Sequence, residues 1–86
     1  MSAARLSSIS TQTLSALLER TRLQQLGKTP PASQLANIKR NLEVLKDGIL
    51  QLEQSQGEES TPTNTLRGQW ERAKRMLGED GHGIPE

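Results

Sequence analysis

The chain has 86 residues, enough for one small domain. Hydrophobic residues make up 31 % of it and there is one aromatic, so any core must be built mainly from Leu and Ile. The 11 basic and 10 acidic residues are well mixed, which argues against a nucleic-acid surface. The absence of Cys excludes disulfides and thiol catalysis. No apolar run approaches the ~20 residues that span a bilayer, so we expect no membrane insertion by this segment.

The first predicted helix spans about residues 8 to 26. The residues before it are rich in Ser and Ala and have no acidic residue, as in a transit peptide, but we expect them to form a frayed first helical turn. Leu14, Leu17 and Leu18 define its apolar face, which Ile9 extends by about a turn. Gly27 is well placed to take the left-handed conformation just past the helix end. The two prolines that follow cannot continue this helix but can open the next one.

The second predicted helix spans about residues 32 to 55 and has the clearest pattern. Six large aliphatic residues recur at spacings of 3, 4, 3, 4 and 3, and so form one stripe: Leu35, Ile38, Leu42, Leu45, Ile49 and Leu52. We predict that this stripe packs against the other two helices. A self-associating coiled coil is the alternative, although the proline break and the short length weigh against it. Gly48 costs about 1 kcal/mol relative to Ala, which a closely packed neighbour would explain.

The third predicted helix spans about residues 63 to 77. Thr61 and Pro62 have the residue types of an N-cap and a first helical position, and Gly78 is expected to end the helix. Its apolar residues recur at spacings of 4, 3 and 4: Leu66, Trp70, Ala73 and Leu77. Residues 79–86 contain two Gly and a Pro and are predicted to form a flexible tail or linker.

These elements predict an all-α fold with no strands. Loops of about five to eight residues place successive helices antiparallel. We therefore expect a short antiparallel up-down-up three-helix bundle over residues 1–78, with flexible termini and a monomeric state.

No residue pattern indicates catalysis, a metal site or a cofactor. His82 lies between glycines in the predicted tail, where no rigid scaffold would position further ligands. Glu58 and Glu59 lie in a polar loop, where neither carboxyl would be buried for acid–base work. The glycine-rich stretch from Gly78 to Gly83 lacks the Lys-Ser/Thr pair of a phosphate-binding loop. We expect a non-enzymatic protein-interaction domain.

Four cations of the third helix are the candidate partner-binding residues: Arg67, Arg72, Lys74 and Arg75. They could favour an acidic partner surface or lipid headgroups. The alternative is that they form the solvated face of a packed helix, with the last three complementing its negative C-terminal end.

Three segments resemble, in chain order, the N-terminal region of small syntaxin-type SNAREs, especially the fungal syntaxin-eight-like Qc SNAREs. They are LLER at residues 17–20, NLEVLKDGI at 41–49 and LRGQWER at 66–72, and the resemblance covers about residues 10–78. In that family a short three-helix bundle precedes the fusion-driving SNARE motif. A SNARE central layer would require a Gln on the aliphatic stripe, and the stripe of this chain has none. The resemblance therefore implies the regulatory N-terminal domain alone.

The resemblance also implies a role in vesicle trafficking and membrane fusion. The implied partners are a tether, a Sec-one/Munc-eighteen-type protein, a vesicle adaptor or other SNAREs, at the cytosolic face of endosomal or vacuolar membranes. The alternative is a freestanding helical adaptor subunit of a cytoplasmic scaffold or tethering complex. A regulatory domain should be a folded monomer by itself, whereas an assembly subunit should be partly unfolded or oligomeric without its partner.

Overall fold

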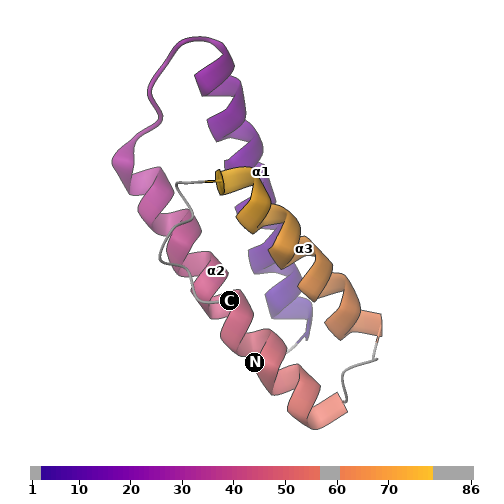
Figure 1. Cartoon of the computed structure of the whole chain (residues 1–86). Helices are drawn as coiled ribbons and strands as arrows, with labels where there is room; N and C mark the ends of the chain where they lie inside the picture. The colour runs from indigo at the N-terminus through magenta and orange to yellow at the C-terminus, as the bar shows by residue number, and fades with distance from the viewer. Residues whose placement is uncertain (1–2, 57–60, 79–86) are drawn as a thin grey trace.

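The computed structural model describes residues 3–56 and 61–78, which form three helices (Figure 1). α1 spans Ala3–Gln25, α2 spans Ala32–Gln56 and α3 spans Thr61–Leu77. The described ranges contain no strand, and every pair of helices is in contact, so the predicted all-α bundle is confirmed. Figure 1 shows α1 and α3 running in the same direction and α2 running antiparallel to both. The bundle measures 44 × 22 × 18 Å, so it is as elongated as its long helices require.

The end of α1 has the hydrogen bonds that its glycine predicts. Gly27 has a φ of 75°, and its N–H donates to the Gln24 carbonyl at 3.0 Å. The N–H of Lys28 donates to the Leu23 carbonyl at 2.9 Å. These two bonds form a Schellman motif, which satisfies carbonyls that have no partner within the helix. The prolines that follow cannot extend α1, and α2 begins directly after them at Ala32.

α3 begins at Thr61, two residues before its predicted start. A proline is tolerated in the first turn of a helix, so Pro62 does not delay the start. Gly78 directly follows the helix with a φ of 57°, in agreement with its predicted role as the residue that ends it. The predicted loop at 57–60 and the predicted tail at 79–86 lie outside the described residues.

The stripes of α2 and α3 supply most of the core. From α2 the buried apolar side chains are Ile38, Leu42, Leu45, Ile49 and Leu52, and from α3 they are Leu66, Trp70, Ala73 and Leu77. Leu35, at the start of the α2 stripe, is half-buried and packs against this cluster. Full burial of one such aliphatic side chain contributes about 1.5–3 kcal/mol. The stripe of α2 is thus covered by helices of its own chain.

The buried face of α1 is rotated relative to the predicted one, although Leu17 is buried and Ile9 and Leu14 pack against the core. Its buried residues are Leu6, Ser10, Thr13 and Leu17, at spacings of 4, 3 and 4. Of the three leucines predicted for its core face, Leu17 is buried, Leu14 is half-buried and Leu18 is 62 % exposed. The prediction for Leu18 was therefore wrong. The expected frayed turn is also part of the helix, because α1 begins at Ala3 and Leu6 is fully buried.

Small polar side chains on the core face of α1 explain this rotation. The Thr13 hydroxyl donates to the Ile9 carbonyl at 2.7 Å, so a hydroxyl is buried without losing its hydrogen bond. The Ser10 hydroxyl donates to Oε1 of Gln69 in α3 at 2.6 Å. Since Ser and Thr are small, α1 can approach its neighbouring helices closely at these positions. One residue turns a helix by about 100°, so Leu18 falls outside a face centred on these positions.

Gly48 determines how closely α1 approaches α2. A Cβ built on Gly48 would lie 2.8 Å from Cδ1 of Leu6 and 3.1 Å from its Cγ. Real Cβ atoms essentially never come within 3.0 Å of such a neighbour, so Leu6 occupies the space that a side chain would need. The predicted packing of a neighbour against this glycine is confirmed.

Candidate interaction surface

Trp70 is the centre of the candidate surface, between α2 and α3. Its side chain is only 6 % exposed, and its indole Nε1–H donates to the Leu42 carbonyl of α2 at 2.9 Å. A buried indole is stable when its N–H has such a partner. The bond therefore fixes the orientation of the ring relative to both helices.

Two lysines lie over the ring of Trp70. The Nζ of Lys46, from α2, is 4.6 Å from the ring centroid, and the Nζ of Lys74, from α3, is 5.4 Å from it. Both distances fall within the ~6 Å at which a cation is attracted by an aromatic face. Lys46 follows Leu42 by four residues and Lys74 follows Trp70 by four, so each lies about one helical turn along its helix. The indole hydrogen bond thus brings both ammonium groups to one ring.

A surface hollow of about 710 Å³ opens beside these lysines. Its lining residues are Lys46, Trp70, Glu71, Lys74, Arg75 and Gly78. Three cations and one carboxylate give this lining a formal charge of +2. On a chain with a net charge of +1, this is a local concentration of positive charge.

A second hollow, of about 220 Å³, shares Lys46, Trp70 and Glu71 with the first. It adds Ile49 and Leu50, and Leu50 is 44 % exposed. Its remaining lining residues, Glu53 of α2 and Arg67 of α3, form an ion pair. We call the two hollows together the α2–α3 groove. The groove is basic at the end near Gly78, whereas the lining of its other end, with two cations and two carboxylates, has no net formal charge and includes Ile49 and Leu50.

The structure brings only two of the four predicted partner-binding residues to the basic end, Lys74 and Arg75. Arg67 lies at the other end, where it pairs with Glu53. Arg72 is exposed and lines neither hollow. The four residues therefore do not form one patch.

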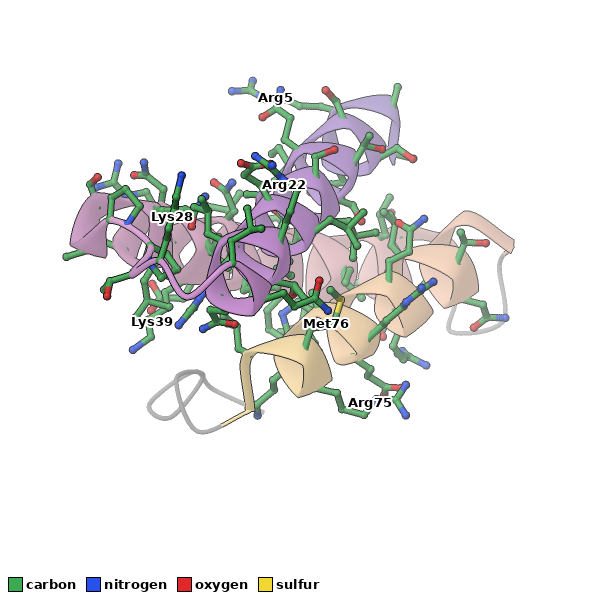
Figure 2. All side chains as sticks on the ribbon, turned by 90° about the horizontal axis from the view of Figure 1, so that it is seen from above. Arg5, Arg22, Lys28, Lys39, Arg75 and Met76 are labelled. Atoms are coloured by element: carbon green, nitrogen blue, oxygen red, sulfur yellow. The ribbon has the colours of Figure 1, made fainter. Side chains whose placement is uncertain are left out.

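Arg75 and its neighbour point in different directions. Figure 2 shows Arg75 projecting from the outer side of α3, whereas Met76 points toward α1. Arg75 is exposed, and Met76 is 37 % exposed. The guanidinium of Arg75 is therefore on the solvent side of the bundle.

Lys46 and Glu71 belong to the basic end, but the sequence did not indicate them. One signal was available, because Lys46 is adjacent to Leu45 and lies at the edge of the aliphatic stripe. A cation at that position must lie near the next helix, but which residue it meets there depends on the packing.

A separate ion pair lies on α1, within and just after the LLER segment. The Glu19 carboxylate accepts two hydrogen bonds from Arg22, at 2.6 Å and 3.1 Å. The hydrogen bond from Arg22 lowers the pKa of Glu19, and the same bond raises the pKa of Arg22. Both side chains are exposed, so solvent screens the pair and limits its contribution to stability.

Among the described residues, no three His, Asp or Glu side chains are grouped so that they could hold a metal ion. His82 and the Glu58-Glu59 pair lie outside this part of the chain. Within the same part, no helix combines the length and apolar character needed to cross a bilayer.

Comparison with protein-family models, with characterised proteins and with solved structures gave no match to this chain.

Proposed function

We propose that this chain is a non-enzymatic protein-interaction domain, and specifically the regulatory N-terminal domain of a syntaxin-type SNARE. One observation carries the proposal: the aliphatic stripe of α2 is buried by α1 and α3 of the same chain. A bundle that covers its own stripe can fold without a partner, and its outer surface is then available for binding. A subunit that completes a larger assembly would instead need this stripe for its partner.

The segments that resemble the SNARE family are also the ones that hold the bundle together. The segment at 41–49 supplies the carbonyl that accepts the hydrogen bond from Trp70, which belongs to the segment at 66–72. The segment at 17–20 contributes Leu17 to the same core. All three segments therefore contribute to one folded core.

In this role the domain would bind a tether, a Sec-one/Munc-eighteen-type protein, a vesicle adaptor or another SNARE. The proposed location is the cytosolic face of endosomal or vacuolar membranes. Binding would use the outer surface of the bundle, since the helix stripes are occupied by the core.

The proposal is tested on the endogenous protein. An antibody raised against this chain is used to blot fractionated source cells and to precipitate the protein from a detergent extract. We expect a band well above the 9.5 kDa of this chain, in the membrane pellet, with SNARE proteins identified in the precipitate by mass spectrometry. A band near 9.5 kDa in the supernatant, with no SNARE in the precipitate, would refute the proposal. Antibody pre-absorbed with the purified chain is the control.

A second measurement separates the domain from an adaptor subunit. Circular dichroism and sedimentation equilibrium on the purified chain should show a cooperative melt from a helical monomer. A chain that is largely unfolded, or that becomes helical only as an oligomer, would favour the adaptor instead.

A further inference from the structure

We propose that the α2–α3 groove binds an acidic peptide segment of a partner protein, whose carboxylates are received by Lys46, Lys74 and Arg75. This inference rests on the proposed interaction function and specifies the chemistry of the partner. The groove joins a basic hollow to one with no net formal charge that includes Ile49 and Leu50, and both are lined by the same tryptophan.

The two lysines are positioned before any partner arrives. Both ammonium groups lie within 5.4 Å of the centroid of a ring that is itself fixed by a hydrogen bond across the helices. Both side chains are half-buried. Freely moving lysines lose more rotamer entropy on binding than lysines already held in place, so this arrangement favours binding of an anion.

The charges of the lining favour carboxylates over a polyphosphate. The Glu71 carboxylate lines the same hollow as the three cations, and it would repel a densely charged phosphate group. A peptide can accommodate it, because backbone N–H groups donate to a carboxylate while acidic side chains pair with the cations. Two peptide carboxylates would neutralise the formal charge of +2.

The exposed Leu50 at the other end of the groove favours a peptide for an independent reason. Leu50 is 44 % exposed and lies in the hollow that shares Lys46 and Trp70 with the basic one. A segment that carries an apolar residue beside its acidic residues would cover Leu50 while its carboxylates reach the lysines. The ion pair of Glu53 and Arg67 lines this end of the groove.

The test uses the purified 86-residue chain and a fluorescein-labelled peptide of repeated Asp-Glu-Leu units. Fluorescence anisotropy should show saturable binding that weakens as salt is raised, because salt screens exposed charges. A peptide of repeated Lys-Arg-Leu units should not bind. Trp70 is the only aromatic residue, so its intrinsic fluorescence should change with the unlabelled acidic peptide and report contact at the groove.

Substitutions locate the site. The Lys46→Gln/Lys74→Gln double variant should weaken peptide binding by about fivefold or more, the effect of losing two ion pairs of ~0.5–1 kcal/mol each. Lys28→Gln/Arg40→Gln is the matched control, since it removes the same charge from exposed positions outside the groove and should change binding by less than about twofold. Circular dichroism confirms that each variant is folded. Should the lysine variant lose helicity, Arg75→Gln at an exposed position serves in its place and should also weaken binding.

Three outcomes would overturn the inference. The first is an acidic peptide that does not bind, and the second is a groove variant that binds as tightly as the control variant. The third is flotation of the chain with vesicles containing phosphatidylserine and a phosphoinositide while the peptide does not bind, which would make the groove a membrane-binding site. If the antibody precipitates SNARE proteins but the acidic peptide does not bind the chain, only this inference is refuted. If the peptide binds but no SNARE protein is precipitated, only the SNARE assignment is refuted.

Discussion

Replacing Gly48 by Ala tests the packing of α1 against α2. Two effects oppose each other at this position. Ala is favoured over Gly inside a helix by about 1 kcal/mol. The added methyl would come within 2.8 Å of Cδ1 of Leu6, whose side chain is fully buried and has little room to move. Overpacking of this kind costs about 1–3 kcal/mol, so we expect Gly48→Ala to lower the free energy of unfolding by about 0–2 kcal/mol.

Gly68 provides the matched control. It also lies inside a helix, but a Cβ built there meets nothing within 4 Å. Gly68→Ala should therefore show the helix-propensity effect alone and raise the free energy of unfolding by about 0.5–1 kcal/mol. Urea denaturation, followed by far-UV circular dichroism and by the fluorescence of Trp70, measures both variants.

A double-mutant cycle attributes the difference to Leu6. Leu6→Ala by itself should cost about 2–5 kcal/mol, because it empties part of the core. In that background Gly48→Ala should become stabilising by about 1 kcal/mol, which gives a coupling energy of about 1–3 kcal/mol. If Leu6→Ala alone does not fold, recovery of helical signal in the double variant is the readout. Equal stabilisation by Gly48→Ala and Gly68→Ala in the wild-type chain would show that Leu6 does not pack on Gly48.

The remaining predictions concern the core and the surface. Leu45→Ala should lower the free energy of unfolding by about 2–5 kcal/mol, whereas Leu18→Ala, at an exposed position, should change it by less than about 0.5 kcal/mol; equal costs in urea denaturation would contradict the observed face of α1. The hydrogen bond from Arg22 lowers the pKa of Glu19, so its stabilising contribution is present above the unfolded-state pKa and is lost as pH falls through the folded-state value. Carbon-detected NMR titration should show the Glu19 pKa rising toward its ordinary value in Arg22→Ala, and an unchanged pKa would show that the pair does not form in solution.

The C-terminal ends of α1 and α3 were predictable because they depend on neighbouring residues. Gly27 and Gly78 take positive φ angles next to helix ends, where glycine is the favoured residue. The α2 stripe was also predictable, since a helix with six aliphatic residues on one side has only one face to bury. The position of Gly48 beside that stripe indicated a close neighbour, although it could not name Leu6.

The face of α1 was not predictable in this way. Its leucines outline one face, but the helix buries Ser10 and Thr13 with them, because a hydroxyl can keep a hydrogen bond inside the core. A pattern based on hydrophobic residues alone treats Ser and Thr as polar and leaves them off the predicted core face. The sequence therefore placed Leu18 inside and treated Leu6 as part of a frayed end.

The sequence by itself determined three helices, their breaks and the buried sides of α2 and α3, because each depends on residues within a few turns of one helix. Only the tertiary structure decided how α1 is rotated and which side chains meet in the groove. Lys46 and Lys74 are 28 residues apart, and they meet over one ring because Trp70 donates its N–H to Leu42 across the helix interface. The relative rotation of packed helices follows from the fit of side chains on both partners, and no pattern within one helix contains that information.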